Sequence, residues 1–235
     1  MRNKNIFSIC TLIILGLLLI FANGCKKEKE NDSNPTPVNT VTDIDGNIYH
    51  VVTIGTQVWM VENLKTTKYR DGTSIPNVIG NSTWGLLTTG VYCDYDNSSS
   101  NSTTYGRMYN WYAINDAHNI CPSGWHIPTD AEWTTLTNYL GGLSVAGAKL
   151  KETGIAHWTS PNVDATNENG FTALPGGTRW VDGVFGLIGT EGRWWTSTEN
   201  DAQNAWWRMI NNTTGSVVRT NNLKTYGLSV RCIKD

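Results

Sequence analysis

The chain has 235 residues, a net charge of -2 and only 16% charged residues. It has no basic stripe, so nucleic acid is not expected as a partner. It has 23 glycines and 11 tryptophans, and all the tryptophans follow Thr40. This composition favours loop-rich β structure around an aromatic core, because each indole ring buries a large area.

The first residues have the pattern of an export signal. A short basic start over residues 1–5 precedes an uncharged, apolar stretch over residues 6–22. An uncleaved anchor is the alternative, because a spanning helix needs about 20 apolar residues and this stretch is near that length. Both interpretations attach the rest of the chain to a membrane.

The segment after the apolar stretch, Ala22-Asn23-Gly24-Cys25, resembles the lipobox of bacterial lipoproteins, although that family usually has Leu where Ala22 stands. The resemblance implies that residues 1–24 are a signal peptide and that the thiol of Cys25 carries lipid. One acyl chain anchors a protein weakly, and a triacylated cysteine would anchor it stably.

Residues 25–40 are predicted to be a flexible tether, because they are charged and then rich in Asn, Pro and Thr, with no apolar periodicity. Residues 26–30 resemble the charged segment that follows the lipid cysteine in surface-exposed lipoproteins of the Bacteroidetes. This implies an outer-membrane or cell-surface location, and a plain spacer is the alternative. Residues 41–235 are long enough for a single domain with its own core.

The domain begins with a predicted β-hairpin. Strand-like residues 48–54 and 57–60 are joined by Gly55-Thr56. Residues 68–89 are rich in turns, and the polar residues 94–104 are predicted to be an exposed loop. The closely spaced aromatic residues over 105–114 predict a short buried helix.

The strongest local signal is a helix start. Thr129 and Glu132 form a capping box, in which each side chain can bond the backbone N–H of the other residue. Apolar residues then recur at helical spacing: Trp133, Leu136, Tyr139 and Leu140. Gly141-Gly142 ends this helix, and residues 144–153 predict a second one.

The last third of the chain is again strand-like. Short apolar runs separated by turns favour an antiparallel sheet, and they cover residues 171–180, 184–188, 192–199, 205–210, 215–219 and 226–233. Because strands come first, helices follow and strands return, the predicted fold class is α+β.

Four segments together resemble the Fibrobacter succinogenes major paralogous domain, a family of exported, often lipid-anchored bacterial proteins. They are GWHIPTDAEW (124–133), GFTALPGG (170–177), WWTSTE (194–199) and YGLSVRC (226–232). Their order and spacing agree over about residues 43–234. The family has no established biochemical function to carry over.

A more distant resemblance concerns the fold. IPTDAEW (127–133) is similar to a segment of formylglycine-generating enzymes, which share the C-type-lectin-like fold. The similarity implies two helices packed against short sheets, chain ends that meet, and a long loop region that carries ligand sites. It does not imply the oxidase, because that enzyme uses two neighbouring cysteines near its C-terminus and Cys232 stands alone.

C-type lectins join a cysteine near a helix to one in the last strand. That resemblance implies a disulfide between Cys121 and Cys232, which would leave Cys93 as a buried free thiol. An exported domain meets conditions in which such a bond persists. A different pairing that includes Cys93 is the alternative. No Cys or His spacing indicates a zinc site.

We predict no enzymatic activity, because no histidine lies in a nucleophile-elbow context. The four histidines are His50, His118, His126 and His157. The alternative is an enzyme that acts on extracellular polymers, for which Glu132 and Glu199 are a candidate carboxylate pair.

Two tryptophan doublets are candidate ligand-binding residues: Trp194 with Trp195, and Trp206 with Trp207. Neighbouring residues of a strand point to opposite faces, so one ring of each doublet could be core and the other a platform for a sugar ring. We favour the alternative, in which all four rings are core.

Glu199, Asn200 and Asp201 lie between the doublets and offer oxygen ligands of the kind that calcium takes. A solvated hairpin turn is the alternative that we favour, and no other cofactor is predicted. Taken together, the sequence predicts a surface-displayed lipoprotein with a recognition or adhesion domain. A glycan is its first candidate ligand and a protein its second, and a structural envelope protein without a small ligand is an alternative.

Overall fold

The computed structural model describes residues 39–235. The predicted signal peptide, the lipid site Cys25 and nearly all of the tether lie outside the described residues. Within residues 39–235, no helix has both the length and the apolar character needed to cross a membrane.

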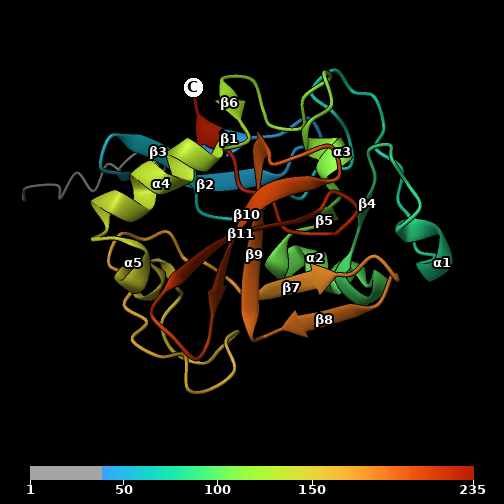
Figure 1. Ribbon diagram of the computed structural model, residues 1–235. Helices are drawn as coiled ribbons and strands as arrows, with labels where there is room; N and C mark the ends of the chain where they lie inside the picture. The colour runs from blue at the N-terminus through green and yellow to red at the C-terminus, as the bar shows by residue number, and fades with distance from the viewer. Residues whose placement is uncertain (1–38) are drawn as a thin grey trace, which may run out of the picture. The chain divides into compact units, whose positions relative to one another are not determined.

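The first sheet brings the beginning and the end of the domain together (Figure 1). Its strand order is β1 (Thr40–Thr42), β2 (Ile48–Ile54), β3 (Gln57–Met60), β12 (Ile233–Lys234) and β6 (Trp125–His126). The predicted hairpin is confirmed, with Val52 opposite Trp59. In the last strand, Ile233 pairs with Trp59 on one side and His126 on the other.

A second sheet, in the order β11 (Val217–Leu223), β10 (Asn204–Asn211) and β9 (Glu191–Glu199), holds both tryptophan doublets. Two small hairpins accompany it: β4 (Tyr92–Cys93) with β5 (Met108–Tyr109), and β7 (Gly176–Arg179) with β8 (Phe185–Ile188). All these strand pairs are antiparallel, and with the helices they confirm the α+β class.

The predicted capping box begins helix α4 (Asp130–Tyr139). The N–H of Glu132 donates to the Thr129 hydroxyl at 3.2 Å, and the N–H of Thr129 donates to the Glu132 carboxylate at 2.7 Å. Gly141 and Gly142 follow with φ near 100°, a conformation that favours glycine. Helix α5 (Leu143–Leu150) then ends before the predicted residue 153, because Lys151 turns extended and bridges to Ala173.

Residues 81–114 differ from the expectation. The turn-rich stretch contains α1 (Asn81–Trp84), and the expected loop contains a 3₁₀ turn, η1 (Tyr95–Asn97), and α2 (Ser99–Tyr105). The predicted short buried helix over 105–114 is confirmed only at its end, as the single turn α3 (Trp111–Ile114), since residues 108–109 form β5 instead. Gly106, with φ of 77°, ends α2, and Asn110 caps α3.

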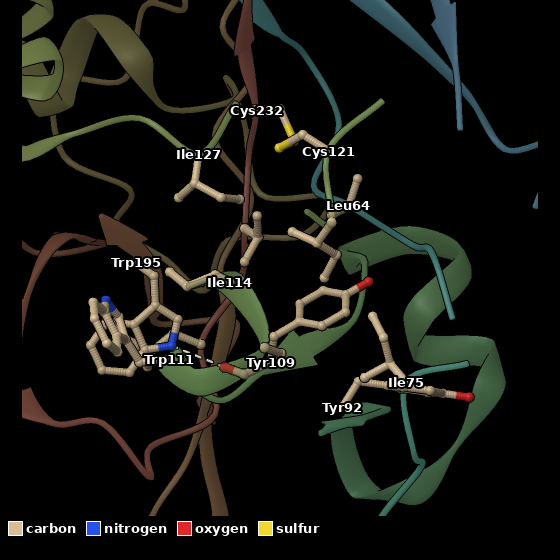
Figure 2. Close-up of a cluster of buried hydrophobic side chains, with 14 of the residues drawn as sticks. Leu64, Ile75, Tyr92, Tyr109, Trp111, Ile114, Cys121, Ile127, Trp195 and Cys232 are labelled. Carbon is tan, nitrogen blue, oxygen red and sulfur yellow. Dashed lines mark hydrogen bonds between the residues drawn. A yellow bond between two sulfur atoms is a disulfide. The ribbon is translucent and has the colours of Figure 1, made fainter. Parts of the chain in front are cut away.

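Both faces of the second sheet are buried at the middle of β9. On one face Trp194 lies 6.1 Å from Trp133 of α4, ring centre to ring centre. On the other face the Trp195 indole N–H donates to the Tyr109 carbonyl at 2.9 Å, beside Trp111 (Figure 2). Helices α4 and α5 therefore cover one face of the sheet, and β5 and α3 cover the other.

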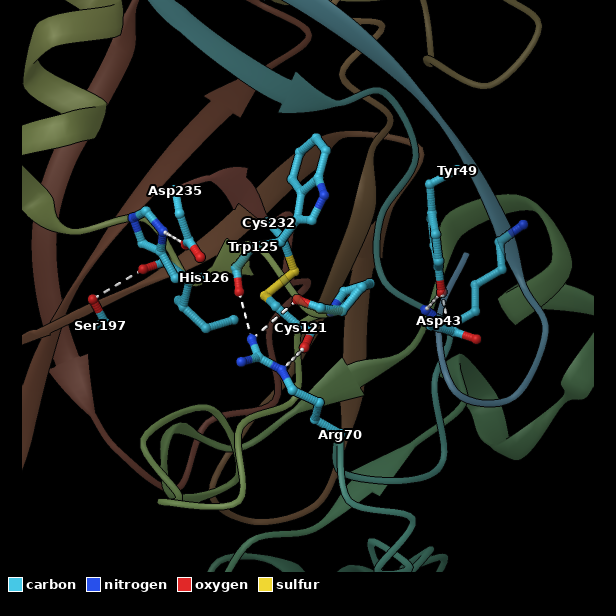
Figure 3. The surroundings of a disulfide bond; sticks show 12 residues. Asp43, Tyr49, Arg70, Cys121, Trp125, His126, Ser197, Cys232 and Asp235 are labelled. Atoms are coloured by element: carbon cyan, nitrogen blue, oxygen red, sulfur yellow. Dashed lines mark hydrogen bonds and ion pairs between the residues drawn. A yellow bond between two sulfur atoms is a disulfide. The ribbon is translucent and has the colours of Figure 1, made fainter. Parts of the chain in front are cut away.

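The disulfide between Cys121 and Cys232 is present, as the lectin resemblance implied. It lies at the junction of β6 and β12, where Arg70 donates to the carbonyls of Cys121, Pro122 and Trp125 (Figure 3). Cys93 is a buried free thiol, and burial raises its pKa to about 12.

Reduction of this disulfide should destabilise the domain strongly. The two cysteines are 111 residues apart, and in the chain-entropy model a loop of that length restricts the unfolded chain by about 4 to 5 kcal/mol. We expect Cys121→Ser with Cys232→Ser to lower the free energy of unfolding in urea by several kcal/mol. Cys93→Ser is the control, because it keeps the disulfide and should be destabilised by reductant as the parent is, whereas the double variant should not respond to reductant. An unchanged midpoint in the double variant would contradict the assignment.

Candidate functional site

Three of the four doublet rings lie in the core, as the favoured interpretation has it. Trp194 and Trp195 are fully buried and Trp207 is 5% exposed. A platform on the first doublet does not occur, because both faces of β9 are covered there. Trp206 is half-buried, with the guanidinium of Arg219 3.6 Å from its ring centre. These four rings offer a ligand little surface.

The acidic segment between the doublets forms the β9–β10 hairpin turn. The Asp201 carboxylate accepts from the backbone N–H groups of Gln203 and Asn204 and from the side-chain amides of Asn200 and Asn204. The amide of Asn204 and these other donors lower the pKa of Asp201 to about 2. Glu199 pairs instead with the ammonium of Lys224. The oxygens proposed for calcium are thus already engaged in turn and ion-pair contacts.

The two candidate catalytic glutamates are likewise engaged. Glu132 accepts from Thr129 and faces the Nε2 of His126 at 2.9 Å, while Glu199 pairs with Lys224. Within residues 39–235, no cluster of three or more His, Cys, Asp or Glu side chains is arranged to hold a metal ion.

Three neighbouring surface hollows share lining residues. The first, of about 410 Å³, and the second, of about 490 Å³, share Tyr112. The second and the third, of about 220 Å³, share Asn115 and Asp116. We call this series the Tyr112 groove. The hollow beside Arg70 and the one beside Arg107 share no residue with it.

A single buried amide fixes the walls of the middle hollow. Asn110 is 1% exposed, and its side-chain oxygen accepts from the N–H groups of Ala113 and Val91. Its side-chain NH₂ donates to the carbonyl of Thr89 at 2.8 Å. Because α3 carries Tyr112 and residues 88–90 form the facing wall, Asn110 sets the width of the hollow.

Gly90 allows the two walls to approach closely. A Cβ at this position would lie 2.1 Å from the Tyr69 hydroxyl and 2.9 Å from the Cα of Ala113. Any side chain at position 90 would therefore push residues 88–90 away from α3.

Asp116 and His118 give the middle hollow its charge. The backbone N–H and the imidazole of His118 both contact Oδ1 of Asp116, and Asp71 lies 3.8 Å from the same imidazole. The hydrogen bond and charge of Asp116 raise the pKa of His118, and the hydrogen bond from the His118 backbone helps lower that of Asp116. Both side chains reach solvent, so they can bind polar groups.

His126 lies at the far end of the groove, in the third hollow. Its Nδ1 lies 2.7 Å from the carboxylate of Asp235 (Figure 3). On the other side, its Nε2 lies 2.9 Å from the carboxylate of Glu132. Partial burial lowers the pKa of His126, but the hydrogen bonds to the two carboxylates outweigh it and the net pKa is raised. The protonated ring donates to both partners, which connects β6, α4 and the C-terminal residue.

Lys224 forms the opposite end, in the first hollow. Its ammonium pairs with Glu199, donates to the Ala202 carbonyl at 2.9 Å and lies 4.6 Å from the centre of the Trp111 ring. The Trp111 indole N–H in turn donates to the carbonyl of Thr196. Buried neighbours thus hold this end of the groove in place.

Sequence reasoning did not identify Tyr112, Asn115 or Asp116. Tyr112 was assigned to a buried helix, and it becomes accessible because that segment shortens to one turn at the surface. The run Asn115-Asp116-Ala117-His118-Asn119 did carry a signal, since polar residues with both acceptors and donors lie there between two buried segments.

These features define an α+β domain with a disulfide-linked sheet and a series of three adjoining surface hollows. The chain matches the family model of the Fibrobacter succinogenes major domain over residues 52–234, and it belongs to that family. No curated protein and no solved structure matches it.

Asn110→Ala should destabilise the domain by about 1 to 3 kcal/mol, because it leaves the buried backbone N–H of Val91 without its acceptor and removes the side-chain donor to the Thr89 carbonyl. Urea unfolding measures this. Asn138→Ala, at an exposed position of α4, is the control and should stay within about 0.5 kcal/mol of the parent. Equal stability of the two variants would show that Asn110 does not hold the walls.

The contribution of His126 to stability should depend on pH. A raised pKa in the folded state means that the stabilisation is fully present below the unfolded pKa of about 6.5 and is lost as the pH rises through the folded value. The difference in unfolding free energy between the parent and His126→Asn should therefore shrink from pH 6 to alkaline pH.

An NMR titration of the His126 ring provides the direct readout and should give a pKa above that of an unperturbed histidine. Asp235→Asn should lower it, because one of the two carboxylates is lost. A stability difference that stays constant across this pH range would rule out the coupling.

Proposed function

We propose that this protein is a surface-displayed lipoprotein whose domain recognises glycans without acting on them as an enzyme, and that the Tyr112 groove is its binding site. The single observation that supports this site is that its three hollows adjoin. The first and second share Tyr112, and the second and third share Asn115 and Asp116. The lipid anchor at Cys25 rests on the lipobox resemblance, and the location at the outer membrane or cell surface rests on the charged segment over residues 26–30.

We also propose that the fold is C-type-lectin-like. Three features support this: the disulfide from the segment before α4 to the residue just before the last strand, the meeting of the domain ends in one sheet, and the two helices that pack on short sheets. The groove lies among long connections of the domain, where that fold carries its ligand sites.

The chemistry of the lining residues supports a glycan. Sugar rings present apolar faces that stack on aromatic rings, and hydroxyl groups that pair with amides and carboxylates. Tyr112 supplies a partly exposed ring at the centre, and amides lie on both sides of it: Gln203 in the first hollow, Asn115 in the second and Asn119 in the third. Such a mixture of one aromatic platform and several fixed polar groups suits a sugar chain.

A glycan-array screen of the full chain in detergent, with and without calcium, tests the proposal. We expect binding that persists without calcium and that falls at least about tenfold in Tyr112→Ala, a loss of about 1.4 kcal/mol. Tyr139→Ala is the matched control, because Tyr139 is 63% exposed on α4 and does not line the groove.

Trp206→Ala tests whether a glycan binds at Trp206, the other candidate residue from the sequence, and not at Tyr112. Binding lost in Trp206→Ala but kept in Tyr112→Ala would place the site on the β10–β11 face instead. No binding to any glycan of the array would reject the ligand class and favour a protein ligand.

A further inference from the structure

We propose that the Tyr112 groove takes an extended, uncharged glycan chain along its length, and that it discriminates against acidic chains. This inference rests on the proposed function and adds the class of ligand. It follows from two separate observations, the continuity of the three hollows and the charge of the side chains around them.

The three adjoining hollows indicate an elongated ligand. The hollows of about 410, 490 and 220 Å³ adjoin one another, so a ligand seated on Tyr112 has lined surface on both sides. Small-molecule pockets usually occupy about 300 to 1,000 Å³, and the two larger hollows each reach that range alone. A single sugar would fill only part of the groove, whereas a chain would contact Gln203 at one end and Asn119 at the other.

The charged side chains in and around the groove indicate that the ligand is uncharged. The carboxylates that line the groove or contact its lining side chains are Asp71, Asp116, Glu132, Glu199 and Asp235. The cationic groups are Lys224, which pairs with Glu199, and Arg70, whose backbone N–H donates to the Asn119 carbonyl and whose guanidinium donates to three backbone carbonyls of residues 121–125. Carboxylates stay in excess even when His118 and His126 are both protonated.

The negative charge would repel a uronate or a sulfate over several ångströms, at distances where salt screens exposed charges only in part. Hydroxyl groups of a neutral sugar carry no such penalty, and they can donate to the carboxylate of Asp116. The groove thus favours a neutral polysaccharide over an acidic one of similar shape.

Binding of the full chain to ladders of neutral glucan, xylan and mannan oligosaccharides, from monosaccharide to octasaccharide, tests the proposal. Oligogalacturonates of the same lengths serve as acidic probes. We expect affinity for one neutral ladder to rise at least about tenfold with length before it levels off, and affinity for the acidic ladder to be at least about tenfold weaker.

End variants test whether the chain spans the groove. Gln203→Ala and Asn119→Gly should each weaken only the longer oligosaccharides, because short ones need not reach either end. Glycine is chosen since Asn119 has φ of 57°, a conformation that alanine resists. Asn97→Gly is the matched control, because Asn97 is exposed, has φ of 53° and lies outside the groove.

The outcomes separate the two proposals. Binding that is independent of length, or tighter for oligogalacturonates, would overturn the present inference and leave a glycan-binding function in place. Absence of binding to every ladder and to the glycan array would overturn both. End variants that weaken all lengths equally would place the ligand at one hollow rather than along the groove.

Discussion

Strand β9 is buried on both faces, and this burial requires other elements of the domain to pack against each face. Trp194 and Trp195 point in opposite directions, and neither has exposed surface. One indole buries 150 to 250 Å², which at about 25 cal/mol per Å² gives an upper limit of about 4 to 6 kcal/mol per ring. Helices α4 and α5 must cover one face, and β5 with α3 must cover the other.

Covering the second face places the candidate site. Helix α3 lies over the sheet because Trp111 donates to the carbonyl of Thr196, and this leaves the next residue, Tyr112, at the surface. Asn110 then holds residues 89–91 beside the same turn. A recognition surface here would be rigid, because it packs directly on the core. Less conformational entropy of the protein would then be lost when a ligand binds.

Local signals in the sequence were reliable where a few adjacent residues decide the conformation. The hairpin over 48–60 and the capping box at Thr129 and Glu132 were predicted correctly, because turn residues and side-chain caps act over short distances. The helix expected over 105–114 formed only at 111–114, since the residues before it make a strand and both segments pack against distant strands. The Cys121–Cys232 pair was obtained from a family resemblance and not from spacing.

By itself the sequence determined the α+β class, the family, the main strands and the start of α4, because these depend on residue order, periodicity and local hydrogen bonds. Only the tertiary structure decided which tryptophans are accessible and which polar residues share a groove. The alternation of a strand places side chains on two faces, but it does not say that both faces will be covered. Exposure at Tyr112, and the grouping of Asp116 with His126 and Lys224 along one groove, arise from contacts between segments far apart in the chain.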